Sequence, residues 1–471
     1  MDRISTIANH VKAAASCRKE RMQTLQSSPA AAAPQQSPPK IYPLPTKGGE
    51  QTITLTLLAG GNSGHVCAAL IEENTGGRVK TQLLTSKPNE WKQNPKVTFP
   101  DGTEQVGRIH RISDNPADLI PESDIILWTG PVWATKDIFE NIRPFFNPRR
   151  TAIGTIFAQG LVHLLAYRTF GPEVHFFALR NIPWLCRLTK MGEASQIVGV
   201  KSSLDVITMN LTEDWVKKWL EPLFVAQKMG KWEPVMQQLP DFCPIVFNPA
   251  NQIIHPARYW ALFRSWNGTP LTGDKEPGEW LYRGFDEVAG NVLQVLDEEL
   301  QQLKDAYMAA TSAQGCKSVI PLARRLQEQY GDQIEDNSTL AKMVGTNKAY
   351  SMAKTPFLKT NLGVMPNPTH RVVLDDIGWG LCVLVSIAER LEVAGIKTPT
   401  NMMRMMIEWH QQMMGKEFLY NGRLRGRDCS DLVLLRADDP LDLVANVPAG
   451  SKVAWLSWAE EQADEYRIGN P

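Results

Sequence analysis

Several residue patterns are missing from this sequence of 471 residues, and each absence excludes a class of protein. The seven cysteines stand singly, no CxxC pair occurs and the count is odd. This usage is typical of free thiols in a reducing compartment, rather than of a disulfide framework or a zinc site. We therefore expect no metal centre and a cytoplasmic protein. The cysteines are Cys17, Cys67, Cys186, Cys243, Cys316, Cys382 and Cys429.

An excess of charge of one sign and a long apolar run are missing too. Lys+Arg and Asp+Glu both number 50, so the formal net charge is zero. Such a chain has no electrostatic attraction to nucleic acid or to an anionic membrane. The most apolar stretch, 381–388, is much shorter than the roughly 18 residues that a membrane-spanning helix needs. We expect neither nucleic acid nor a membrane among its partners.

Proline is missing before Pro29, and the first part of the chain differs from the rest. Residues 1–48 end in an Ala-rich and Pro-rich stretch that offers too little apolar surface to offset chain entropy, which predicts disorder. An organelle-targeting peptide is the alternative, because basic residues outnumber acids there. The remaining length exceeds what one core usually supports, so we expect two domains, 49–242 and 243–471.

The front half alternates strands and helices. Strands are predicted at Ile53–Leu58, Val79–Leu84, Asp124–Trp128 and Thr151–Ile156, and a helix at His65–Glu73. Strands that alternate with helices imply an α/β fold with a doubly wound parallel sheet, as in Rossmann-like nucleotide-binding domains.

The back half is mostly helical by its apolar spacing. Two helices follow from residues 285–303 and 377–388. A third begins near Asn401, with Thr400 or Asn401 as its cap, and carries six methionines that are typical of adaptable core filling.

A glycine turn joins the first strand to the first helix. Its sequence, Ala59-Gly60-Gly61-Asn62-Ser63-Gly64, would present backbone N–H groups and the helix dipole to a pyrophosphate. Gly61 would let the backbone approach the phosphates closely, and Gly64 would let the helix pack near the strand. The usual fingerprint is GxGxxG, so Ala59 makes the turn a variant. An ordinary tight turn is the alternative interpretation.

The end of the second strand bears on the choice of cofactor. An acid there would hold ribose hydroxyls and exclude NADP. This chain has Leu84-Thr85-Ser86-Lys87 instead. Ser86 and Lys87 could meet a 2′-phosphate, or Lys87 could be a solvated surface residue. The residues leave NAD and NADP both open.

Three residues of the back half form a candidate acid/base and binding set. His255 precedes a proline, which favours an extended conformation, and its imidazole suits proton transfer near neutrality. Asp375 or Asp376 could orient this histidine, although carboxylates before a predicted helix are commonly caps. Arg371 could grip a carboxylate with its planar fork, or form a surface ion pair.

Short motifs in order along residues 53–440 resemble the octopine (opine) dehydrogenases. They are Gly60–His65, Ile182–Arg187, Ile254–Pro256, Thr346–Tyr350, Pro366–Asn367, His370–Asp376 and Gly415–Leu419. Two features depart from the family pattern, namely Ala59, which would loosen nucleotide binding, and the N-terminal extension.

The resemblance implies a reductive condensation of a 2-oxo acid such as pyruvate with an amino acid or taurine, driven by NADH or NADPH. It implies His255 as the catalytic histidine, Asp376 as its partner, Arg371 as the anchor of the substrate carboxylate, and Gln159 as a residue of the substrate cleft. It also implies a monomer or weak oligomer. A 2-oxo acid reductase without an amine partner and a non-catalytic nucleotide sensor are the alternatives.

Overall fold

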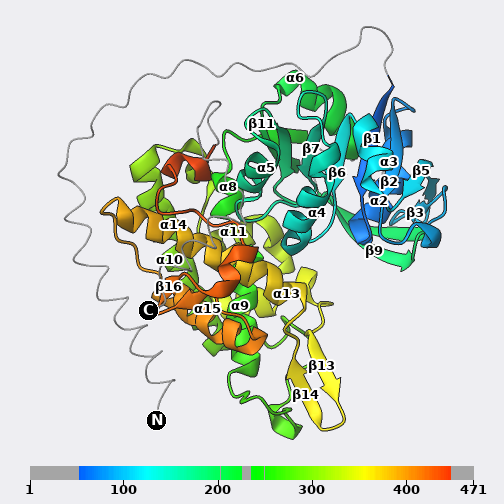
Figure 1. The fold of residues 1–471 in the computed structure, drawn as a ribbon. Coiled ribbons are helices and arrows are strands. Elements are labelled where there is room, and N and C mark those ends of the chain that lie inside the picture. Colours follow the sequence, from blue (N-terminus) through cyan, green and yellow to red (C-terminus); the bar gives the residue numbers. More distant parts are fainter. Residues whose placement is uncertain (1–51, 202, 225–234, 249, 447–471) are drawn as a thin grey trace.

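The structure is a computed structural model that describes residues 52–201, 203–224, 235–248 and 250–446 (Figure 1). The predicted N-terminal extension, with its alternative as a targeting peptide, lies outside these ranges. The last strand of the large sheet ends at Gln238, and the first helix of the second half begins at Cys243. We propose the boundary between the two halves at this point, next to residue 242.

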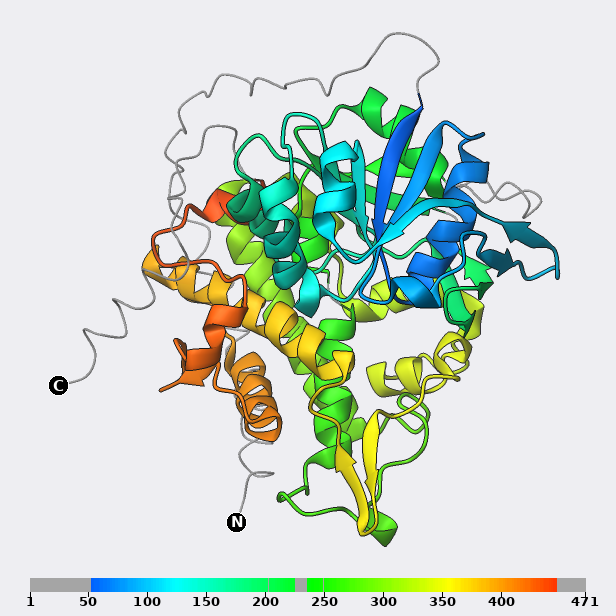
Figure 2. The ribbon, with the colours of Figure 1, turned by 45° about the vertical axis from the view of Figure 1, so that its right-hand side comes forward.

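An eight-stranded sheet forms the centre of the first half, and all four strands predicted from the sequence belong to it (Figures 1 and 2). Every neighbouring pair is parallel except β8 and β11, which are antiparallel. The order of the strands is β12 (Val235–Gln238), β11 (Ser203–Met209), β8 (His175–Leu179), β7 (Ala152–Thr155), β6 (Ile125–Trp128), β1 (Ile53–Leu58), β2 (Val79–Leu84) and β5 (Ile109–Ser113).

Helices cover both faces of this sheet, as expected for a doubly wound fold. In β6, Ile125 and Leu127 join one core cluster, whereas Ile126 and Trp128 join another, because successive strand side chains point to opposite faces. The first cluster includes residues of α2 (Asn62–Asn74) and α7 (Glu221–Phe224), and the second includes residues of α4 (Thr135–Ile142) and α5 (Val162–Phe170).

A second, four-stranded sheet, which the sequence did not predict, packs against α2. Its order is β4 (Glu104–Val106), β3 (Lys96–Thr98), β10 (Ala194–Val200) and β9 (Trp184–Lys190). The side-chain oxygen of Asn62 accepts a hydrogen bond of 2.8 Å from the backbone N–H of Leu188 in β9. The strand β9 is thereby fixed beside the glycine turn.

The second half is helical, with a β13–β14 hairpin (Phe357–Thr360 and Gly363–Pro366) that projects from it (Figure 2). None of the helices within the described ranges has both the length and the apolar composition to cross a membrane. The main helices are α8 (Cys243–Val246), α9 (Ala250–Phe263), α10 (Glu287–Thr311), α11 (Leu322–Tyr330), α12 (Leu340–Gly345), α13 (Arg371–Val373), the π-helix η10 (Leu374–Leu381), α14 (Cys382–Val393) and α15 (Asn401–Met414).

The start of α15 differs from the prediction of a local cap. Thr400 occupies the N-cap position, but its side chain makes no capping hydrogen bond. The carboxylate of Glu299 in α10 accepts hydrogen bonds from the backbone N–H groups of Met402 (2.8 Å) and Met403 (3.0 Å) instead. Burial raises the pKa of Glu299 to about 7. The cap therefore comes from a residue about a hundred positions away, which local patterns do not reveal.

The conformation of His255 also corrects a prediction. A following proline favours extended backbone, yet His255 and Pro256 both lie inside α9. Eleven residues of α9 are buried, so the packing of this helix outweighs the local preference.

Candidate active site

The glycine turn lies between β1 and α2, where the sequence placed it. A Cβ atom added to Gly60 or Gly61 would meet no other atom within 4 Å. A Cβ atom on Gly64, by contrast, would lie 2.5 Å from the Cβ of Ala59 and 3.0 Å from the Oγ1 of Thr129. Gly60 and Gly61 therefore border open space, whereas Gly64 permits the close packing of α2 on the neighbouring strand ends.

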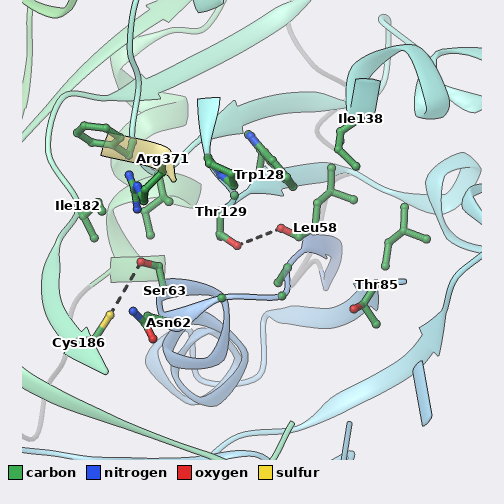
Figure 3. A pocket seen from close by; sticks show the side chains of 18 of the residues that line it. Leu58, Asn62, Ser63, Thr85, Trp128, Thr129, Ile138, Ile182, Cys186 and Arg371 are labelled. Atoms are coloured by element: carbon green, nitrogen blue, oxygen red, sulfur yellow. Dashed lines mark hydrogen bonds between the residues drawn. The ribbon is translucent and has the colours of Figure 1, made fainter. Parts of the chain in front are cut away.

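The open space is a cavity of about 690 Å³ at the carboxyl ends of the strands (Figure 3). Figure 3 shows Thr85 and Arg371 on opposite sides of it, with Ser63 and Thr129 between them. A crevice at this edge of an open α/β sheet is the usual site for a dinucleotide.

Four of the six residues predicted to bind the cofactor line this cavity, namely Gly60, Gly61, Asn62 and Ser86. Gly64 lies beneath it in the helix. Lys87 is absent from the wall, and its ammonium group forms an exposed ion pair of 2.9 Å with Glu90.

Two charged residues of the wall were not found from the sequence. Asp114 follows β5, and the backbone bond from Thr85 N–H to the Ser113 carbonyl (3.0 Å) brings it beside the end of β2. Arg187 lies in β9, next to the strand position that Asn62 holds. The pairing of β5 with β2 is the signal that could have found Asp114, because it brings an acid after β5 to the end of β2.

His255 and Asp376 meet in the helical half, as the sequence predicted for catalysis. The Nδ1 atom of His255 and the Oδ2 atom of Asp376 are 2.6 Å apart, and both side chains are buried. His255 comes from α9 and Asp376 from η10, two elements in extensive contact. A carboxylate on Nδ1 holds one tautomer and orientation of the imidazole, which is the arrangement of a general acid or base.

Gln159, which the resemblance places in the substrate cleft, contacts Asp376 and does not line the cavity at the glycine turn. Its Nε2 atom donates hydrogen bonds to the Asp375 carbonyl (3.1 Å) and to Oδ1 of Asp376 (3.2 Å). Both carboxylate oxygens of Asp376 thus have partners. Gln159 follows β7, so this contact connects the sheet with the acid/base pair.

Neither Asp375 nor Asp376 caps the helix that contains it, because this helical segment already begins at Arg371. Asp375 instead accepts a hydrogen bond from the backbone N–H of Trp133 (3.2 Å), at the start of a short helix in the first half. Burial, and next the charge of Asp376, raise the pKa of Asp375 to about 7.

Arg371 links the cavity to the acid/base pair. It lines the cavity, and its Nε atom lies 3.4 Å from Oδ2 of Asp375, the neighbour of Asp376. Its side chain is 54% exposed, so the guanidinium remains accessible to an anion in the cavity. His255 itself does not belong to the wall of this cavity.

Two further side chains near His255 were missed. The hydroxyl of Tyr282 is hydrogen-bonded to Nε2 of His255. His370, half-buried, caps α13 by accepting from Val372 N–H (3.2 Å). Burial, and next the positive charge of Arg371, lower the pKa of His370. Within the part of the chain that the structure describes, no cluster of His, Cys, Asp or Glu could hold a metal ion.

Comparison with known proteins supports the resemblance to the octopine dehydrogenases. A family model for the NAD/NADP octopine/nopaline dehydrogenase, alpha-helical domain, matches residues 238–414. The octopine dehydrogenase of Mizuhopecten yessoensis is 25% identical over 390 residues, which are 80% of this chain and 94% of the relative. The tauropine dehydrogenase of Arabella iricolor is 23% identical over 391 residues, 80% of this chain and 96% of the relative. The helical half of the chain thus matches the octopine/nopaline dehydrogenase domain, and most of the chain is similar to octopine and opine dehydrogenases.

Solved structures of this family share the fold. An octopine dehydrogenase bound to NADH and L-arginine superposes with a TM-score of 0.70 at 24% identity, covering 81% of this chain and 94% of the other. A yersinopine dehydrogenase bound to NADP⁺ gives a TM-score of 0.55 at 13% identity, covering 81% and 96%. The predicted fold, a Rossmann-like domain followed by the helical opine dehydrogenase domain, is confirmed. The matched segment 238–414 contains His255, Arg371 and Asp376.

Proposed function

We propose that the protein is an opine dehydrogenase that condenses a 2-oxo acid with an amine and reduces the product with NADH. The observation that carries this proposal is the buried His255–Asp376 pair, with Arg371 extending from the same helical segment into the cavity of the glycine turn. An acid/base group, an anion-binding group and a nucleotide cavity are the three parts that this reaction requires. The relatives of this chain include an octopine dehydrogenase, an opine dehydrogenase and a tauropine dehydrogenase.

The charged groups of the cavity wall are placed as a dinucleotide requires. The N–H groups at the start of α2, together with Arg187, favour the negative diphosphate. Asp114 lies at the end of the paired strands β2 and β5, where the adenosine ribose of a dinucleotide lies in this fold. Its carboxylate can accept from ribose hydroxyls and would repel a 2′-phosphate. These features favour NADH over NADPH, and octopine dehydrogenase structures likewise contain NADH.

The proposed chemistry has two stages. The amine nitrogen adds to the carbonyl carbon of the oxo acid and water leaves, which gives an imine. Reduced nicotinamide, when bound, supplies a hydride. His255 transfers the accompanying proton at Nε2. Asp376 accepts from Nδ1–H and stabilises the positive imidazolium. The imine plus one hydride and one proton gives the secondary amine of the opine.

Arg371 is the proposed anchor for the carboxylate of the oxo acid. Its guanidinium lies between the cavity and the Asp375–Asp376 segment, so a carboxylate bound to it would place the reacting carbon near both. Positioning of this kind can lower a barrier by up to roughly 7–11 kcal/mol. Gln159 supports the site indirectly, because it holds Asp376. Pyruvate, which is bound in one octopine dehydrogenase structure, is the expected oxo acid.

The test is an absorbance assay at 340 nm, an NADH band, with purified protein, pyruvate and a panel of amines that includes arginine, agmatine, glycine, alanine and taurine. NADH and NADPH are compared in parallel. Oxidation that requires both pyruvate and one amine supports the proposal and identifies the amine. Oxidation with pyruvate alone indicates a simple oxo-acid reductase. Binding of NADH without turnover on a wide panel of oxo acids and amines indicates a nucleotide sensor.

A further inference from the structure

We propose that Tyr282 is a positioning residue that fixes His255 as a proton acceptor at Nε2. The phenol oxygen is hydrogen-bonded to Nε2 of His255, while Nδ1 of the same ring is hydrogen-bonded to Asp376. The imidazole is therefore held at both nitrogens by buried partners from different elements, the loop before α10 and the π-helix η10. This role rests on the proposed function, because it concerns the group that moves the proton of the imine.

The backbone around Tyr282 is fixed by the helix that carries His255. Arg258, three residues after His255 in α9, donates from Nε to the Leu281 carbonyl (2.6 Å) and from Nη2 to the Arg283 carbonyl (3.2 Å). These carbonyls flank Tyr282 on both sides. Arg258 is only 4% exposed, so this contact is shielded from water. The helix α9 thus supplies both the imidazole of His255 and the arginine that holds the backbone on either side of Tyr282.

The ring of Tyr282 is held by a second set of contacts. It stacks on Tyr350, with ring centroids 4.7 Å apart and an angle of 29°. Tyr350 in turn meets the ring of Tyr330 edge-on at 5.1 Å. Tyr282 is 8% exposed, and a rotation away from His255 would break the stack. The phenol is therefore placed by packing as well as by its hydrogen bond.

The direction of the hydrogen bond follows from the donors available. The carboxylate of Asp376 accepts at Nδ1, so in the neutral ring Nδ1 carries the proton and Nε2 is the acceptor. Tyr282 must then donate its O–H. Burial raises the pKa of Tyr282 well above its ordinary value, which keeps the hydroxyl protonated. Without this donor, the neutral ring would lose a hydrogen bond at Nε2 that favours it over imidazolium.

The other charged or titratable groups that face this ring are few. Asp376 faces it from η10. His370 and Arg371 precede and begin the same helical segment, and the charges of His255 and Asp376 both act on His370. Tyr350 and Tyr330 lie behind Tyr282. His370 is half-buried, so its protonation is a separate influence on any pH profile.

The first experiment compares Tyr282→Phe with Tyr259→Phe in the full chain. Tyr259 is a matched control because it lies in the same helix as His255, is buried, and its hydroxyl donates to the Pro356 carbonyl (2.9 Å) and accepts from Asn367 N–H. The substrate is the opine that the wild-type enzyme forms, oxidised with NAD⁺ across pH 5–10. We expect Tyr282→Phe to lower kcat by about ten-fold, the effect of one hydrogen bond. The KM for NAD⁺ should stay unchanged, and the acidic limb of kcat/KM should move to higher pH.

Tyr259→Phe should lower the melting temperature without moving that limb. A Tyr282→Phe enzyme whose pH profile matches the wild type, or equal shifts in both variants, would overturn the proposal.

A second measurement needs no active variant. Nitrogen NMR of ¹⁵N-histidine-labelled wild-type protein at pH 8, with His255 assigned by its loss in His255→Asn, reports the tautomer directly. We expect the neutral Nδ1–H form with an unprotonated Nε2. An Nε2–H form would contradict the proposal even if the enzyme is active. The same spectrum keeps its meaning if the protein shows no opine dehydrogenase activity, so failure of the proposed function and failure of this inference remain distinguishable.

Discussion

His255 and Asp376, 121 residues apart in the chain, are joined by a 2.6 Å hydrogen bond between Nδ1 and Oδ2. The bond connects α9 with η10, and Gln159 from the sheet half supports its carboxylate. The acid/base pair therefore depends on three separate segments, and it is assembled only when both halves are folded and packed together.

Replacement of either partner should affect the chemistry more than the binding of NADH. We expect His255→Asn and Asp376→Asn to lower kcat by roughly 10²–10⁴-fold, the usual contribution of general acid/base catalysis. The Kd for NADH, measured by nucleotide fluorescence, should hardly change, because neither residue lines the cavity. His110→Asn in β5, which breaks only a contact with Glu72, is the control and should keep its activity. Full turnover in His255→Asn would remove His255 from the mechanism.

The charge of Asp114 should set the preference between the two nucleotides. Removing a carboxylate near the ribose removes its repulsion of a 2′-phosphate, so Asp114→Ser should raise the ratio of kcat/KM for NADPH to that for NADH by at least roughly ten-fold. Asp118→Ser changes a nearby carboxylate outside the cavity wall and should leave the ratio alone. An unchanged ratio in Asp114→Ser would mean that another group selects the nucleotide.

Two glycines of the same turn should respond differently to alanine. A methyl group on Gly64 would overlap Ala59 and Thr129, so Gly64→Ala should lower the free energy of unfolding by about 1–3 kcal/mol. Gly60→Ala adds a methyl group to open space and should change that free energy by less than about 0.5 kcal/mol. Because Gly60 lines the cavity, its variant should nevertheless weaken NADH binding. Denaturant unfolding and nucleotide titration of both variants separate the two effects.

Asp375 should make the stability of the protein depend on pH. Its pKa is raised from 3.8 to about 7, so the folded state holds this proton more tightly than the unfolded state does. The stabilising contribution is fully present below about pH 4 and is lost as the pH rises through about 7.

An asparagine side chain in place of Asp375 cannot ionise but keeps an acceptor for Trp133, so Asp375→Asn should be more stable than the wild type by roughly 1–3 kcal/mol at pH 8. The difference should shrink toward pH 5 in thermal unfolding. The exposed substitution Asp332→Asn should show no such trend. A difference that is constant with pH would argue against a neutral Asp375.

The carboxylate of Glu299 should be important for the helix α15. Glu299→Ala leaves two buried N–H groups without their acceptor and should cost about 2–3 kcal/mol of unfolding free energy. Glu298→Ala removes the adjacent, half-buried carboxylate in the same helix and should cost less than about 1 kcal/mol. Equal losses in the two variants would show that α15 does not depend on this cap.

The sequence predicts the fold well where short-range patterns determine it. The strand, glycine turn and helix from Ile53 to Asn74 follow from alternating apolar residues and glycine, and the helix α10 follows from its apolar spacing. The family motifs predicted the pairing of His255 with Asp376. The second sheet was missed because its strands are short and come from distant parts of the chain.

Contacts at long range set the limits of this prediction. Tyr282 lies in a loop with no pattern of its own, and contacts with distant residues such as Arg258 and Tyr350 hold it beside His255. Asp114 is adjacent to the end of β2 only through strand pairing. The helical conformation of His255 before a proline, likewise, results from the burial of α9 and not from local preference.

The π-helix η10 has a consequence for how this site could be altered. A π-helical turn contains one residue more than an α-helical turn, so it behaves as a single-residue insertion. Two consecutive carboxylates of this segment contact different partners, Asp375 at Trp133 and Asp376 at His255. Loss of one residue from Leu374–Leu381 would shorten the wide turn and change the directions of Asp375 and Asp376 relative to Trp133 and His255. The contacts of both carboxylates therefore depend on the length of that segment as well as on the identity of its side chains.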